Sequence, residues 1–110
     1  MPGAERLTKT GQYAHVYQKG NSWASALLVL KAAPNELMFS RWGLSVSRRV
    51  GGAVVRNRVK RVLREILRQT PVKAGWDIII LVRPAAAQAK YVTLEKALRA
   101  LFARSQLLSE

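Results

Sequence analysis

Three segments of the chain repeat their apolar residues at the spacing of an amphipathic helix. The clearest spans residues 53–69, where valine, leucine and isoleucine side chains fall on one side of a helical wheel and charged side chains on the other. A shorter helix is predicted over 10–19, with Thr10 as its N-cap and Gly20 as its end. A last, leucine-rich helix is predicted near the C-terminus, with Thr93 as its N-cap. Each of these helices has one face suited to packing on a core.

Other segments have the character of β-strands. Residues 23–32 and 37–47 are rich in β-forming residues and are separated by a turn signal at 33–36, which predicts an antiparallel pair. Residues 76–83 are apolar almost without interruption, as in a central strand that is buried on both faces, and Pro84 ends them.

The order of the predicted elements is helix, two or more strands, helix, strand, helix. This order predicts an α+β fold, in which a small mixed sheet is covered by a long basic helix and two further helices. The length of 110 residues fits a single domain with one core, so we expect one domain over 1–110, with residues 1–6 flexible.

Charge narrows the choice of partner. The chain has 19 Lys and Arg against 6 Asp and Glu, a net charge of +13, while 49% of its residues are hydrophobic, as in a folded domain. A folded core with this charge needs an anionic partner, which is nucleic acid, an anionic membrane surface or an acidic protein. The size and folded character favour nucleic acid.

Several kinds of chemistry and location are disfavoured by the composition. The chain has 0 Cys, so disulfides, thiolate metal sites and cysteine nucleophiles are excluded. Its apolar runs are too short to span a bilayer, and residues 1–6 do not have the build of a signal peptide. We therefore expect a cytoplasmic protein that does not act at a membrane.

Much of the positive charge lies in one segment. Residues 48–68 hold eight basic residues and one acidic residue, Glu65. On the helix predicted over 53–69 most of these form a cationic strip, opposite the apolar face. Arginine and lysine on a rigid helix meet several phosphates at once, and asparagine adds hydrogen bonds to sugar, base or phosphate. The residues predicted to bind nucleic acid are Arg56, Asn57, Lys60, Arg61, Arg64 and Arg68 of the strip, with Arg58 further round the helix.

Two other interpretations of the cationic strip are weaker. A solvated face that only maintains solubility normally mixes both signs of charge, whereas this face is almost purely positive. A membrane surface or a calmodulin-like partner would favour bulky aromatic residues on the apolar face, which instead carries β-branched valines suited to a sheet.

A resemblance to a known protein family makes the prediction of function more specific. Residues 41–65, RWGLSVSRRVGGAVVRNRVKRVLRE, closely resemble the protein subunit of bacterial ribonuclease P. The family's signature is Arg-Asn-Arg, then Lys-Arg, then Arg-Glu on one helix, and residues 56–58, 60–61 and 64–65 match it. The first helix, the strand that ends at Pro84 and the leucine-rich last helix also resemble the family, so the likeness spans nearly the whole chain.

The resemblance implies both a fold and a role. The fold would be ribosomal protein S5 domain 2-like. In this family the catalyst is the ribonuclease P RNA, which uses Mg2+ to hydrolyse a phosphodiester and remove the 5′ leader of precursor tRNA. The protein subunit of this endoribonuclease binds that RNA and the single-stranded leader, and no obligate protein partner is expected. The basic helix would meet the catalytic RNA, and a cleft between the first helix and the sheet would hold the leader.

The first helix carries aromatic residues that suit this second role. Tyr13 and Tyr17 lie one turn apart and can stack on unpaired bases, although they equally suit packing of the helix onto the sheet. The alternation of Trp42 with Leu44 and Val46 favours sheet packing for Trp42. Phosphate contacts near the leader are expected from Lys31 and Arg48, with Arg6 and Arg83 as further candidates.

Catalysis by the chain itself is not expected. Hydrolysis of a phosphodiester with Mg2+ usually needs clustered carboxylates, but the six acidic residues are scattered and the single histidine, His15, has no visible partner acid. We expect no catalytic residue and no metal site in this chain, so that Mg2+ is used by the RNA. Two alternative functions remain compatible with the sequence. One is a ribosomal-type RNA-binding protein, and the other is a DNA-binding module with its basic helix in the major groove.

Overall fold

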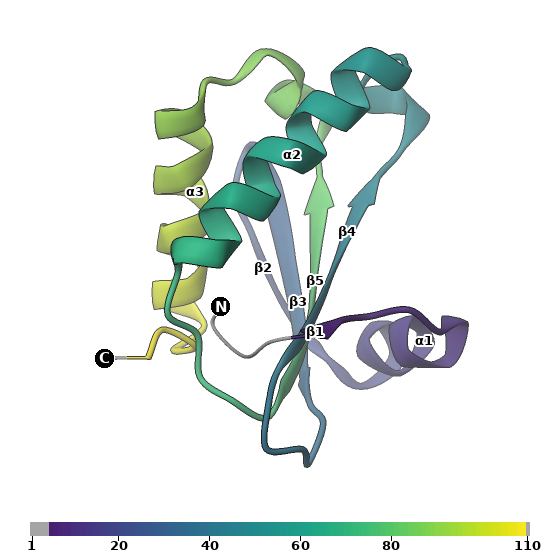
Figure 1. Cartoon of the computed structure of the whole chain (residues 1–110), viewed down its shortest axis with the longest axis vertical. Helices are drawn as coiled ribbons and strands as arrows, with labels where there is room; N and C mark the ends of the chain where they lie inside the picture. The colour runs from purple at the N-terminus through teal and green to yellow at the C-terminus, as the bar shows by residue number, and fades with distance from the viewer. Residues whose placement is uncertain (1–4, 110) are drawn as a thin grey trace.

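A mixed five-stranded sheet lies at the centre of the computed structural model, which describes residues 5–109 (Figure 1). The strand order is β1-β4-β5-β3-β2. Strand β5 pairs in parallel with β4 and antiparallel with β3, while β1 pairs in parallel with β4 and β2 antiparallel with β3. The strands are β1 (Glu5–Arg6), β2 (Asn21–Ala24), β3 (Leu28–Pro34), β4 (Arg41–Val46) and β5 (Trp76–Val82).

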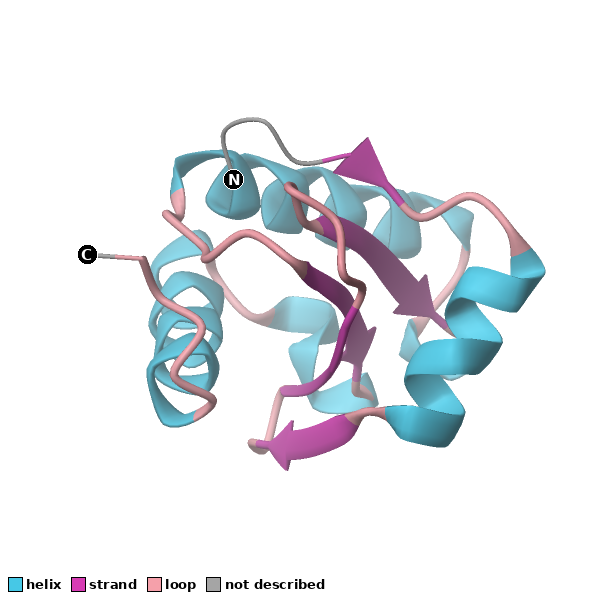
Figure 2. Cartoon of the chain, turned by 90° about the horizontal axis from the view of Figure 1, so that it is seen from below, coloured by secondary structure: helices cyan, strands magenta, loops and turns pink. Residues whose placement is uncertain are grey.

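Three helices cover the two faces of this sheet, as Figure 2 shows from below. The larger core lies under α2 and α3, and a smaller one lies under α1. Short 3-10 helices, η1 and η2, precede α2 and follow β5. The helices are α1 (Thr10–Lys19), η1 (Arg48–Val50), α2 (Ala53–Gln69), η2 (Pro84–Gln88) and α3 (Tyr91–Arg104).

Strand β5 supplies apolar side chains to both cores. Ile78 and Ile80 face the larger core, and Ile79 between them joins the smaller one with Val16 of α1. All three isoleucines have no exposed surface. The prediction of a central strand buried on both faces is therefore confirmed, and so is the α+β class.

The predicted helices are present, with corrections at two caps. Helix α2 spans the predicted residues 53–69. In α1 the N-cap is Lys9, not Thr10, because the Lys9 backbone is extended and its carbonyl accepts the first hydrogen bonds of the helix. Helix α3 begins at Tyr91, so Thr93 lies in its first turn, and the carbonyl of Lys90 accepts from the amide of Leu94.

The predicted antiparallel pair over 23–32 and 37–47 is wrong. The first segment divides at Ser25, whose hydroxyl and backbone hold a turn between β2 and β3. Strands β3 and β4 are not neighbours, because β5 lies between them and pairs with both. Only the centre of the sheet buries a strand that is apolar on both faces, so β5 takes that place.

The first described residues pair with the sheet. Glu5 and Arg6, which belong to the segment expected to be flexible, form β1 beside Arg41 and Trp42 of β4. The amide of Leu7 extends this pairing with a hydrogen bond to the Trp42 carbonyl at 2.8 Å. Residues 1–4 lie outside the described part of the chain.

Candidate nucleic-acid interface

Helix α2 presents the cationic strip to solvent. Val59 and Leu63 on the opposite face have no exposed surface, so packing fixes how the helix is rotated about its axis. Arg56, Lys60 and Arg64 follow one another at intervals of four residues, which places them along a single ridge. All three are half-buried along their stems, as expected for long cationic side chains that lie on a helix surface. The exposed members of the strip are Asn57, Arg61 and Arg68.

Two arginines of the ridge have hydrogen-bond donors that the protein does not satisfy. The Nε atoms of Arg56 and Arg64 are buried and have no hydrogen-bond partner among residues 5–109. A buried donor without a partner costs about 1–3 kcal/mol. No acidic side chain of α2 pairs with either arginine, because the one acid of the helix, Glu65, bonds elsewhere. The ridge thus carries positive charge that no acidic side chain of the described residues neutralises, which suits an external anion.

Two other predicted contacts are engaged within the protein. Arg58 donates from Nη2 to the backbone carbonyl of Ala87 in η2, so it points toward the junction of α2 and η2. Arg68 pairs with Glu65 at 3.0 Å on the exposed surface, and Gln69 donates to the same carboxylate at 2.8 Å. Within the described residues, the cations of α2 that remain available to an external anion are therefore Arg56, Lys60, Arg61 and Arg64.

A second surface lies beside α1 on the other face of the sheet. Tyr17 is 46% exposed, and the Nζ atom of Lys31 in β3 lies 6.0 Å from the centroid of its ring. Lys31 of β3 aligns across the sheet with Ile79 of β5 and Gly43 of β4. The next row of aligned residues on this face, toward the C-terminal ends of β4 and β5, is half-buried. An exposed ring beside a cation on a partly open sheet suits an unpaired base followed by its phosphate.

Tyr13, one turn before Tyr17, is more deeply involved in the fold. Its ring packs against the smaller core, and its hydroxyl donates to the carbonyl of Leu7 at 3.4 Å. The ring also lies directly over Gly43 of β4, where a Cβ atom would collide with the phenol group. Tyr13 therefore has the packing role that the sequence allowed for both tyrosines. Tyr17 is the ring that is more available for stacking on a base.

Substituting Gly43→Ala is expected to destabilise the protein by about 1–3 kcal/mol, because the new methyl group overpacks the contact with Tyr13. Urea unfolding of the single variants and of the Gly43→Ala, Tyr13→Ala double variant measures this. Once Tyr13 is truncated, the added methyl group should cost little. Additive losses in the double variant would show that the strain at Gly43 does not come from Tyr13.

The remaining expected phosphate contacts lie at two places along β4. Arg48 is exposed in η1, just before α2. The Arg6 guanidinium lies 5.5 Å from the centroid of the Trp42 ring, and Trp42 packs against the larger core as the alternation in the sequence predicted. Arg83 donates to the Ser25 carbonyl at 2.7 Å, which fixes the turn between β2 and β3. Arg48 and Arg83 follow the paired ends of β4 and β5, whereas Arg6 lies beside Trp42 near the start of β4, so the structure does not bring all three into one group.

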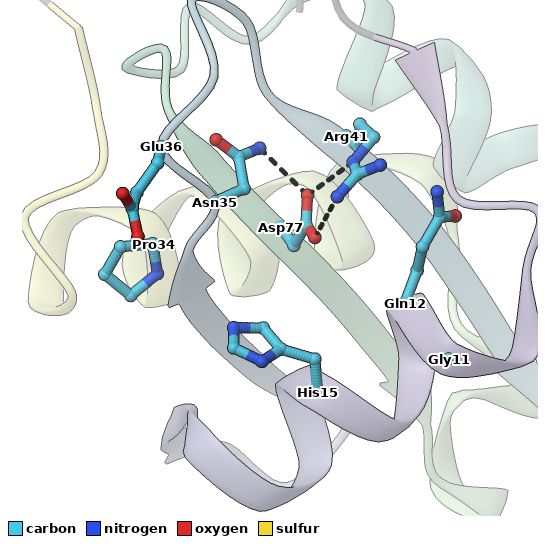
Figure 3. Close-up of a pocket in the computed structure, with 8 residues that line it drawn as sticks. All are labelled: Gly11, Gln12, His15, Pro34, Asn35, Glu36, Arg41 and Asp77. Atoms are coloured by element: carbon cyan, nitrogen blue, oxygen red, sulfur yellow. Dashed lines mark hydrogen bonds and ion pairs between the residues drawn. The ribbon is translucent and has the colours of Figure 1, made fainter.

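A polar pocket that the sequence did not predict lies on the opposite flank of α1 from Tyr17 (Figure 3). It has a volume of about 320 Å³. His15, which has no partner acid near it in the sequence, lines this pocket. The lining residues are Gly11, Gln12, His15, Pro34, Asn35, Glu36, Arg41 and Asp77.

A buried ion pair forms the inner wall of the pocket. Asp77 is 1% exposed, and Arg41 donates to its two oxygens at 2.8 Å from Nε and 2.7 Å from Nη2. The amide of Asn35 also donates to Asp77 at 2.9 Å. The hydrogen bonds that Arg41 itself donates to Asp77 raise the pKa of the Arg41 guanidinium above its usual value, against the opposing effect of its partial burial.

Within residues 5–109, no three His, Cys, Asp or Glu side chains lie close enough together to hold a metal ion. No helix in the same range is both long and apolar enough to cross a membrane.

Comparison with known proteins agrees with this architecture. The family model described as Ribonuclease P matches residues 1–106. A ribonuclease P protein component of Dehalococcoides mccartyi (strain CBDB1) is 44% identical over 110 residues, which cover 100% of this chain and 92% of the relative. The RNase P protein of Staphylococcus aureus superposes with a TM-score of 0.85 at 28% identity, covering 94% of this chain and 97% of that one. The Thermotoga maritima RNase P protein gives a TM-score of 0.83 at 28% identity, with coverage of 91% and 96%. The chain belongs to the ribonuclease P protein family.

Proposed function

We propose that this chain is the RNA-binding subunit of a ribonuclease P, which helps a catalytic RNA to remove the 5′ leader of precursor tRNA. The observation that supports the proposal is the ridge of Arg56, Lys60 and Arg64 on α2, whose charges form no ion pair within the described residues. Each residue of the ridge belongs to one part of the signature Arg-Asn-Arg, Lys-Arg and Arg-Glu, and the family is that of a ribonuclease P component.

The ridge would act by neutralising phosphates of the catalytic RNA. The three cations of the ridge and Arg61 lie within about two turns of α2, and like charges this close repel one another by a few tenths of a kcal/mol per pair. Phosphate removes this repulsion, and each phosphate that is neutralised releases condensed counterions. Exposed Asn57 lies beside these cations and can donate to a sugar, a base or a phosphate. Binding at this face would also lower the Mg2+ concentration that the RNA needs, because fixed protein charges replace part of its counterions.

The surface beside α1 would bind the leader. Tyr17 offers a ring for stacking on one unpaired base, and Lys31 next to it offers a phosphate contact. Tyr13 supports this surface from below through its packing on Gly43. Arg48 is the remaining predicted leader contact.

In this proposal the RNA holds Mg2+ and performs the hydrolysis. Bound magnesium supplies activation of the attacking water and stabilisation of the leaving oxygen. The protein contributes no catalytic group and works in the cytoplasm, where precursor tRNA is made and processed.

The test is cleavage of a precursor tRNA at low Mg2+, with a bacterial ribonuclease P RNA alone, with this protein, and with the protein alone. We expect removal of the leader only when both are present. If the protein binds the RNA but leaves cleavage unchanged, a general role in binding structured RNA, as in ribosomal proteins, replaces the proposal. Sequence-specific binding to duplex DNA at physiological salt would instead support a DNA-binding module.

Substituting Tyr17→Ala is expected to weaken binding of precursors with a leader by about tenfold, since stacking on one base contributes about 1–3 kcal/mol. Binding of mature tRNA should change little. Affinities of the assembled ribonucleoprotein for both tRNAs measure this. Tyr17→Phe should keep the stacking, and Gln18→Ala on the same exposed helix serves as the control. Equal losses for both tRNAs would mean that Tyr17 acts only on the fold.

A further inference from the structure

The pocket on the far flank of α1 is preorganised for a small ligand. Its volume of about 320 Å³ lies at the lower end of the range for small-molecule sites. The segment that carries Pro34 and Glu36 is fixed through Asn35, whose side-chain amide donates to Phe39 and Asp77 and whose backbone amide donates to Gly75. The walls come from α1, from the end of β3 and from the starts of β4 and β5.

The charge of this pocket is opposite to that of the rest of the molecule. Asp77 neutralises Arg41, and Glu36 has no hydrogen-bond or ion-pair partner within the described part of the chain. The pocket therefore has a surplus of negative charge in a protein whose net charge is +13. A phosphate group is disfavoured here, whereas the cationic strip of α2 suits it.

The remaining groups suit a flat ring with donors and acceptors on its edge. In Figure 3 the imidazole of His15 extends toward the ring of Pro34, and both line the pocket. A histidine ring stacks on unpaired bases. Glu36 only accepts hydrogen bonds, while Arg41 uses Nε and one Nη2 hydrogen on Asp77 and has further N–H donors left. Guanine matches both, since it donates from N1 and N2 and accepts at O6 and N7.

We propose that this pocket binds an unpaired guanine base. The source of the base rests on the RNA-binding role proposed above. Tyr17 and His15 lie on opposite flanks of one helix, about 10 Å across, so a strand bound beside Tyr17 reaches the pocket within a few nucleotides. The pocket would then add a preference for guanine at one position of the bound RNA.

The test is an NMR titration of the isotope-labelled full chain with guanosine, adenosine, cytidine and spermidine in parallel. We expect guanosine to shift the signals of His15, Gln12 and Arg41 with a dissociation constant of about 1 mM, a weak affinity suited to one base. Adenosine and cytidine should bind more weakly. Glu36→Gln should lower the guanosine affinity about tenfold, since a bidentate contact is lost. His15→Ala should lower the affinity for all three nucleosides.

The control is Glu95→Gln on α3, which removes an equal charge from an ion pair with Arg99 and leaves the pocket intact. Three outcomes would overturn the proposal: no shift of the pocket signals with guanosine, equal shifts with every nucleoside in both wild type and Glu36→Gln, or binding of spermidine alone. Each is independent of the cleavage assay. Cleavage can depend on the protein while guanosine fails to bind, and guanosine can bind while cleavage is unchanged.

Discussion

Replacing Arg56, Lys60 and Arg64 together with alanine is expected to lower the affinity for a ribonuclease P RNA about a hundredfold, if each lost phosphate contact contributes about 1 kcal/mol. The plot of log affinity against log salt concentration should become shallower by about 2–3 units, because fewer counterions are released on binding. Filter binding or fluorescence anisotropy over a salt series measures both quantities. The three residues form the ridge of α2, so one face of the protein is altered.

The matched control removes the same charge from another helix. Lys90, Lys96 and Arg99 are exposed on or next to α3, and their triple alanine variant should bind nearly as well as wild type. Folding of the α2 variant should be unharmed, because its substitutions remove like-charge repulsion from one helix. If both triple variants lose affinity and slope equally, net charge rather than the ridge governs binding.

Helix α2 and strand β5 were predictable from the sequence because the information is local. The apolar face of α2 repeats over 17 residues between Gly52 and Pro71, and the run in β5 ends at Pro84. The pairing of strands was not predictable in the same way. The sequence of a β-forming segment does not specify which other strand it pairs with. The pairing of β3 with β5 joins segments more than 40 residues apart.

The same distinction applies to the candidate sites. The cationic strip was predictable because one helix carries all of it, and the wheel also placed Arg58 outside the strip. Its partner Ala87 lies 29 residues away, beyond the reach of a helical wheel. The pocket was not predictable, since His15, Glu36, Arg41 and Asp77 come from separate segments and each is isolated in the sequence. The strand ends that line the pocket come together only through the pairing register of β3, β4 and β5.

Substituting Arg41→Ala is expected to destabilise the fold by about 3 kcal/mol, the lower end of the cost of stranding one partner of a buried ion pair. The Asp77 side chain is 2% exposed, so without Arg41 its charge stays buried with only Asn35 as a described side-chain donor. Asp77→Ala should cost less, because the Arg41 side chain is 20% exposed and can turn toward water. Chemical unfolding of both variants measures the two losses. A melting temperature lower by roughly 10 °C or more should accompany the larger one.

The double variant Arg41→Ala, Asp77→Ala separates a stranded charge from lost packing. With both partners removed no charge remains buried, so the double variant should be more stable than Arg41→Ala alone. The expected order of stability is wild type, then Asp77→Ala, with Arg41→Ala lowest. A double variant that loses the sum of the two single losses would show that the residues contribute independently, through their contacts with Asn35 and the strands. The effect of Arg41→Ala in the two backgrounds distinguishes the explanations further. Packing alone predicts the same loss with and without Asp77, whereas a stranded carboxylate predicts the large loss only while Asp77 is present.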